Sequence, residues 1–322
     1  MSVEVGASVD PVASGRGYGP GLCEHGLVKV RFAVAPHPGP VAGAEMLVFG
    51  HALEASGFDG IWLSDLPVAP ILDPMLGVAL LAGATKRLRL GANIVPLGRN
   101  PFLLAKQLAQ LDQISDGRLL LSFVTGLHQP QERGALALDG ASRGAVLEEA
   151  LGLVRAWWAG EAVEHRSERW SFSGLELAAR PIQNPLEVWL GGRGPKALER
   201  VGRVADGWLG AQLTPAEALL ARERIQASAQ RAGREIDPEH FGLSIAYART
   251  RPTPEQLNRR PAQRTDIDPL MVVPVGADGL RSFIRDYVEA GLSKFVIRPF
   301  TAVDSWEEEA EWLAAAILDL QT

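Results

Sequence analysis

The sequence predicts an α/β fold, specifically a (β/α)₈ TIM barrel with insertion loops at the carboxyl ends of its strands. Short runs of β-branched and other apolar residues alternate eight times with longer stretches of helical periodicity, as in parallel strands joined by crossover helices. The chain has 322 residues, 47% of them hydrophobic, which is long enough for one such barrel. We expect a flexible tail over residues 1–27 and a single domain over residues 28–322.

The expected elements follow from these runs. The strands are expected at residues 29–35, 60–63, 88–95, 118–123, 187–190, 207–209, 241–247 and 294–297. The helices between them are expected at residues 42–56, 74–85, 101–115, 143–159, 195–205, 214–233, 277–290 and 305–320.

Capping signals support several of the helix boundaries. Asn100-Pro101 and Thr214-Pro215 each place an oxygen-bearing cap before a proline in the first turn. Asp116-Gly117 follows the apolar periodicity of the third helix, so that helix should end there.

Two connections are longer than ordinary barrel loops, at residues 160–186 and 248–275. Each is a candidate lid or inserted subdomain over a site at the strand ends. For the second, an ordinary surface excursion explains the length equally well.

Composition narrows the functional class. Thirty-two basic and thirty-eight acidic residues give a formal charge of −6, which favours neither nucleic acid nor a membrane surface as a partner. One cysteine, Cys23, and no zinc-type Cys and His spacing favour a reducing compartment, and we expect the cytoplasm. No metal-binding or serine-nucleophile motif occurs, so the expected partner is a small molecule.

The glycine-rich turn after the fifth strand is the strongest local signal. Gly191, Gly192 and Gly194 let backbone N–H groups approach a ligand beside Arg193, and Pro195 begins a helix whose amino terminus favours an anion. A phosphate site, a tight structural turn and a dinucleotide fingerprint remain open alternatives.

Other candidates also follow strands. Asp65 is either a hydrogen-bond acceptor for a cofactor ring or a turn cap. His128 is either an acid or base near neutral pH or a solvated loop histidine. Arg99 and Arg193 are each either a phosphate clamp or an exposed charge.

Several blocks resemble the luciferase-like monooxygenase superfamily over about residues 29–300. The segment from Asn100-Pro101-Phe102-Leu103-Leu104 to Asp112, with Ser115-Asp116-Gly117-Arg118, resembles its third helix. Further blocks similar to that superfamily lie at residues 57–65, 73–74, 188–192, 205–208, 287–291 and 295–299.

The sequences of residues 95–101 and 292–295 most resemble those of a branch of this superfamily that uses coenzyme F420. That resemblance implies a deazaflavin held by residues that match the family pattern: Asp65 at the ring edge, Gly126, and Gly191 to Gly194 along the tail. It also implies a strand bulge with a non-proline cis peptide at Asn93-Ile94, behind the ring.

The chain departs from the sugar-phosphate dehydrogenase branch, because Leu66 and Leu127 stand where that branch has a proton-transferring histidine and glutamate. Asp65 and His128 are the residues left as candidate catalytic groups.

The resemblance also implies a homodimer. Alternatives are an FMN-dependent monooxygenase served by a separate flavin reductase, a flavin- or deazaflavin-binding protein without turnover, and a metal-free aldolase or isomerase, for which no convincing strand-end lysine occurs.

Overall fold

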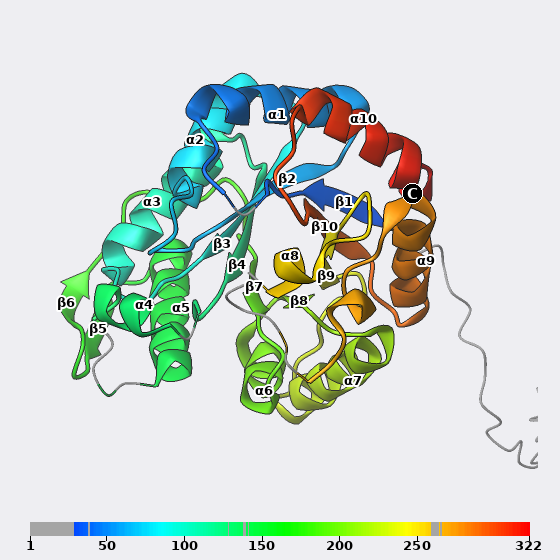
Figure 1. Ribbon diagram of the computed structural model, residues 1–322. Helices are drawn as coiled ribbons and strands as arrows, with labels where there is room; N and C mark the ends of the chain where they lie inside the picture. Colours follow the sequence, from blue (N-terminus) through cyan, green and yellow to red (C-terminus); the bar gives the residue numbers. More distant parts are fainter. Residues whose placement is uncertain are drawn as a thin grey trace, which may run out of the picture.

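The fold is a closed barrel of eight parallel strands in the order β1-β10-β9-β8-β7-β4-β3-β2 (Figure 1). The computed structural model describes residues 29–37, 39–127, 129–137, 140, 142–258, 264 and 266–322. The barrel strands are β1 (Arg31–Val34), β2 (Gly60–Ser64), β3 (Arg89–Ile94), β4 (Leu119–Phe123), β7 (Val188–Gly191), β8 (Gly207–Ala211), β9 (Phe241–Tyr247) and β10 (Lys294–Pro299). All eight expected strands are confirmed.

Helices surround the barrel on its outer side. The expected helices are confirmed as α1 (Gly43–Ser56), α2 (Pro74–Ala84), α3 (Pro101–Ile114), α5 (Arg143–Ala159), α6 (Pro195–Val204), α7 (Pro215–Arg231), α9 (Gly276–Glu289) and α10 (Trp306–Ile317). Two short helices, α4 (Pro130–Ala135) and α8 (Pro254–Asn258), and two 3₁₀ turns, η1 (Pro269–Met271) and η2 (Leu318–Leu320), were not expected from periodicity. No helix of the described part of the chain is long and apolar enough to cross a membrane.

The helix caps act as the sequence predicts. The Asn100 side chain accepts hydrogen bonds from the N–H groups of Phe102 and Leu103, at 3.0 and 3.1 Å. Thr214 and Glu217 form a capping box at the start of α7. Because these bonds join residues two or three positions apart, they are encoded locally.

The main core lies between the strands and the helices. Phe32, Phe123 and Phe295 point outward from their strands and are fully or almost fully buried there. The alternate residues point into the barrel, where an apolar layer is formed mainly by Trp62, Leu120, Trp189, Leu209 and Val296.

The expected lid at residues 160–186 is wrong. This segment forms a hairpin, β5 (Val163–Arg166) and β6 (Ser171–Leu175), on the outer flank of α3 and α5 (Figure 1). The Phe172 ring packs edge-on against the ring of Trp157, with 5.0 Å between centroids. The apolar residues of the hairpin, the buried Val163 and the half-buried Phe172 and Leu175, pack against the helix layer, so the hairpin does not cover the strand ends.

The described residues of the connection over 248–275, in contrast, do lie at the carboxyl ends of the strands. Leu257 of α8 packs with Phe300, which follows β10, and with Ala246 of β9. This segment therefore covers part of the barrel mouth.

Truncation of Trp157 tests the docking of the hairpin. Trp157 is fully buried, and its indole N–H donates to the Leu175 carbonyl at 2.8 Å. Trp157→Ala should lower the free energy of unfolding by about 3–5 kcal/mol in urea denaturation, because it leaves a large cavity. Leu220→Ala, at an exposed site on α7, is the control and should change it by less than about 0.5 kcal/mol. Equal midpoints for the two variants would contradict this packing.

Candidate functional site

The interior of the barrel changes from apolar to polar toward the carboxyl ends of the strands. Above the apolar layer, four strands contribute neutral polar side chains and one contributes an arginine, while other inward positions hold small residues such as Ala35 and Ala246. The polar and charged residues are Ser64, Asn93, Ser122, Ser244 and Arg298. We call these five residues the polar layer. Catalytic sites of (β/α)₈ barrels lie at this end.

Several atoms of the polar layer have no hydrogen-bond partner among the described residues. Asn93 donates its amide to Ser64 Oγ at 3.1 Å, but its Oδ1 is buried and unpaired. Ser122 Oγ and Arg298 Nε are also buried without a partner. Buried polar atoms are normally paired, so these atoms indicate contacts with a ligand or with ordered water.

Arg298 is the charged member of this layer. It lines two small cavities, of about 60 and about 40 Å³, on either side of its side chain. Burial lowers the pKa of its guanidinium below the ordinary value. The last strand resembles the family pattern at residues 295–299, but the sequence does not single out Arg298 as a site residue.

Asp65 is held by neighbouring loops. Its carboxylate accepts from the Val95 N–H at 3.0 Å and pairs with Arg99 at 2.8 Å, and Arg99 also reaches Asp73 at 3.3 Å. Burial raises the pKa of Asp65, and Arg99 opposes this rise. In this structure Asp65 therefore joins the ends of β2 and β3, while its role toward a cofactor or in catalysis remains a prediction.

The expected bulge and cis peptide at Asn93-Ile94 are wrong. The cis peptide bond of the described residues is Asn184-Pro185. The carbonyls of Asn93 and Ile94 accept from the N–H groups of Asp65 and Val124 at 3.0 and 2.9 Å. Both belong to a regular ladder on each side of β3, which leaves no place for a bulge.

The two residues also differ in where their side chains lie. Asn93 faces the interior polar layer, as a cofactor-binding residue must. Ile94 is fully buried in the outer core, so only its backbone is available at the site.

Gly126 lies in a loop fixed by a buried ion pair. Arg143 pairs with Glu132 at 3.0 Å and donates to the carbonyls of Thr125 and Leu127 at 2.9 and 2.6 Å. Gly126 has φ of +72°, and a Cβ there would lie 2.2 Å from Glu132 Oε1. This position therefore requires glycine. His128, the next predicted site residue, lies outside the described residues.

The turn after β7 presents an open backbone. Gly192 has φ of +118°, and Gly194 caps α6 without any side-chain hydrogen bond. Pro195 is the first residue of α6, as predicted, and Arg193 reaches Gln212 Oε1 at 3.3 Å. Residues 192–196 are exposed, so the amino terminus of α6 is accessible to an anion. The closed barrel excludes the dinucleotide-fold alternative.

The fold places the predicted residues along one arc of the mouth. Asp65, Asn93, Gly126 and Gly191 lie at or just beyond the ends of β2, β3, β4 and β7, which are consecutive in the barrel. Arg298 lies on β10, which is separated from β2 by β1, and it faces the same interior.

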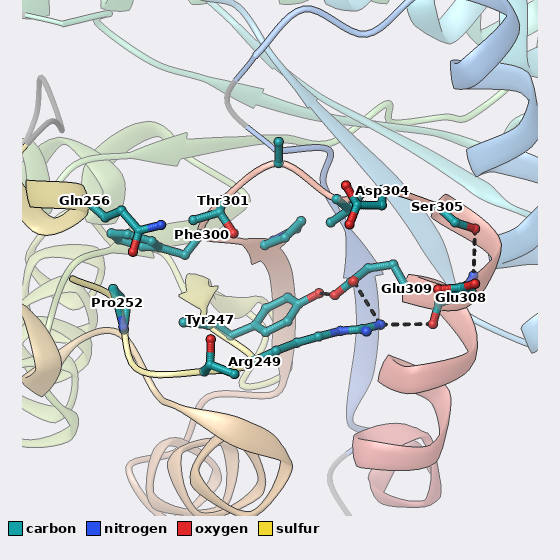
Figure 2. A pocket seen from close by; sticks show the side chains of 15 residues that line it. Tyr247, Arg249, Pro252, Gln256, Phe300, Thr301, Asp304, Ser305, Glu308 and Glu309 are labelled. Atoms are coloured by element: carbon teal, nitrogen blue, oxygen red, sulfur yellow. Dashed lines mark hydrogen bonds and ion pairs between the residues drawn. The ribbon is translucent and has the colours of Figure 1, made fainter.

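A larger cavity of about 180 Å³ lies at the ends of β9 and β10, beside α10 (Figure 2). There the Tyr247 hydroxyl donates to Glu309, and Arg249 pairs with Glu309 at 2.9 Å and donates to the Glu308 carbonyl at 3.0 Å. Burial raises the pKa of Tyr247. These groups satisfy one another, so this cavity points to a ligand less clearly than the polar layer does.

Another cavity, of about 420 Å³, lies at the opposite, amino-terminal mouth between Trp62, Trp189 and the first residues of the strands. Within the described residues, no group of three or more His, Cys, Asp or Glu is placed to hold a metal ion.

The family follows from the comparison of the whole chain. The sequence model of luciferase-like monooxygenases matches residues 25–316. The chain belongs to this family. Its closed barrel, with the polar layer at the carboxyl ends, is the fold expected from the sequence resemblance.

Individual relatives are more distant. The chain is 30% identical over 196 residues to the 5,10-methylenetetrahydromethanopterin reductase of Methanolobus tindarius, covering 61% of this chain and 57% of that protein. It is 30% identical over 181 residues to the F420-dependent glucose-6-phosphate dehydrogenase of Beutenbergia cavernae, covering 52% of each. The matches thus span little more than half the length of these relatives.

A solved structure shows the same fold. An F420-dependent secondary alcohol dehydrogenase in complex with an F420-acetone adduct superimposes with a TM-score of 0.75 at 16% identity, covering 91% of this chain and 100% of that one.

The buried Arg143–Glu132 pair yields a prediction on stability. Arg143→Met should lower the free energy of unfolding by about 3–5 kcal/mol, because it leaves the fully buried Glu132 without its partner. Arg224→Met removes the exposed partner of Glu199 and should lower it by less than about 1 kcal/mol. Chemical denaturation of both variants measures the difference. Similar losses in the two would show that the loop around Gly126 does not depend on this pair.

Proposed function

We propose that the chain is an oxidoreductase that uses coenzyme F420 to transfer hydride to or from a small organic substrate. The observation that carries the proposal is the polar layer, with its unpaired buried atoms, at the end of the barrel where enzymes of this fold act. The named relatives that use F420 support this choice of cofactor.

The residues present fit such a cofactor. Gly192, Gly194 and the amino terminus of α6 offer open backbone to its phosphate, and no atom lies within 4 Å of a Cβ added at Gly194. Asn93 and Ser122 offer unpaired oxygens toward a ring inside the barrel. Arg193 and Pro195 would flank the phosphate. Gly126 and Gly191 would present only their backbone to the tail, because a Cβ at either position would meet Glu132 or Val124.

A bound deazaflavin supplies the carbon that accepts or donates hydride. The chain would bind and orient it, with the apolar layer of Trp62, Leu120 and Val296 lying between the polar layer and the amino-terminal mouth. Leu66 lines the smaller cavity beside Arg298 and cannot move a proton. A substrate other than a sugar phosphate is therefore proposed. Asp65 and His128 are kept as candidate acid–base residues.

We also propose that the protein is a homodimer in the cytoplasm. Leu76 and Leu80 of α2 and Leu103 of α3 are 65%, 37% and 55% exposed on two helices that pack together. Exposed apolar side chains gathered on neighbouring elements are typical of a protein interface.

Titration with F420 and with FMN, followed by fluorescence and calorimetry, tests the cofactor. We expect micromolar or tighter binding of F420 and weaker binding of FMN. A preference for FMN would replace the proposal by a flavin monooxygenase that needs a reductase partner. Binding of F420 without its reduction by any substrate in a broad panel would favour a binding protein without turnover. Binding of neither would reject both cofactors.

Two substitutions at Gly194 locate the phosphate. Serine and aspartate both fit the extended backbone of this position and cap α6, so both variants should keep the melting temperature of the wild type. Gly194→Asp should weaken F420 binding about tenfold or more, because its charge opposes the phosphate. Gly194→Ser, the uncharged control, should bind nearly as the wild type does. Equal affinities for the two variants would move the phosphate elsewhere.

The dimer is tested by sedimentation. Leu76→Glu combined with Leu103→Glu should give a monomer, since burying two carboxylates in an interface is unfavourable. Leu220→Glu, at a 64% exposed site on α7, should remain a dimer. A monomeric wild type would contradict the proposal.

A further inference from the structure

Arg298 differs in its surroundings from most other buried or half-buried arginines. Arg222 also has a buried Nε without a partner, but its guanidinium lies over the Phe241 ring, 5.3 Å from the centroid. Arg143, Arg99 and Arg118 donate to carboxylates, carbonyls or hydroxyls nearby. Arg298 forms no hydrogen bond or ion pair with any described residue, and burial lowers the pKa of its guanidinium. Its charge is therefore uncompensated inside the barrel.

Such a charge destabilises the empty protein. A buried ion without a partner is unfavourable, and an apolar replacement of similar size is often neutral or stabilising. A residue that only supported the fold would be paired, as Arg143 is with Glu132. The uncompensated charge of Arg298 therefore indicates a ligand that carries the missing negative charge.

The space around Arg298 limits that ligand. The two adjoining cavities, of about 60 and 40 Å³, hold a group of a few heavy atoms. Besides Arg298, the larger of them is lined by Ser244, Gln212 and Arg264, and the smaller by Ser64 and His37. The charge of Arg264 is paired with Glu217 and Asp266. The apolar walls include Leu66 and Ile71 on one side and Val272 and Phe300 on the other.

We propose that Arg298 binds the carboxylate of the substrate, so that the substrates of this enzyme are small carboxylic acids with an apolar remainder. The planar guanidinium matches a carboxylate by two parallel hydrogen bonds. The neutral hydroxyls add hydrogen bonds without adding charge, and the apolar walls receive the rest of the molecule. This assignment rests on the proposed function for the reaction, but the carboxylate site itself can be tested without a cofactor.

The first test is the stability of the full-length protein without ligand. Arg298→Met should have a urea midpoint equal to or above that of the wild type. Arg143→Met should have a lower midpoint, because its charge is paired. A lower midpoint for Arg298→Met would assign Arg298 a structural role and overturn the proposal.

The second test is binding of acetate, with acetamide as a neutral probe of the same shape. Tryptophan fluorescence reports it, since Trp62 lines the smaller cavity. The wild type should show a saturable change with acetate and not with acetamide. Arg298→Met should bind acetate about tenfold or more weakly, and Arg298→Lys should lose less. Equal responses to both probes, or an unchanged response in Arg298→Met, would overturn the proposal, as would tighter binding of inorganic phosphate than of acetate.

The third measurement separates substrate from cofactor. F420 should bind Arg298→Met and the wild type with the same affinity, because the proposed phosphate site lies on α6. Loss of F420 binding in Arg298→Met would assign Arg298 to the cofactor and overturn its role toward substrate. If the wild type binds acetate through Arg298 but neither F420 nor FMN, the proposed function fails while the carboxylate site stands.

Discussion

The parallel hydrogen bonds that join β1 to both β2 and β10 close the sheet, and the rest of the molecule depends on that closure. A closed sheet has a narrow interior, which every strand supplies with alternate side chains. Residues from opposite ends of the sequence, such as Ser64 and Arg298, thereby line one small cavity. The same closure leaves all strand ends at one mouth, where loops of different origin meet.

Buried charge is used in two ways at this mouth. Asp65–Arg99 and Glu132–Arg143 are paired and hydrogen-bonded to backbone, so they fix the loops after β2, β3 and β4. Arg298 has no such partner in the part of the chain that the structure describes. The first kind of charge makes the rim rigid, and the second leaves a strong interaction available to a ligand. Preorganised charge of this kind is what binding sites require, at the expense of stability in the empty protein.

Much of the architecture was predictable because it is encoded by neighbouring residues. The Asn100 and Thr214 caps act within three residues, and strand periodicity marks which segments pair. The open turn from Gly191 to Pro195 was also predictable, because the backbone preferences of glycine and of a first-turn proline act locally. The prediction that residues 160–186 cover the strand ends was wrong. Only packing decides whether Phe172 lies over the strand ends or against the outer helices.

The sequence by itself determined the eight alternating units, the helix boundaries and the positions of polar residues after strands, because propensity and periodicity act over short distances. Only the tertiary structure decided how those residues are used. It paired Asp65 with Arg99, placed Asn93 and Ile94 in a regular ladder, and left Arg298 without a countercharge. Whether a charge is compensated depends on side chains from distant strands, and closure of the barrel alone brings those strands together.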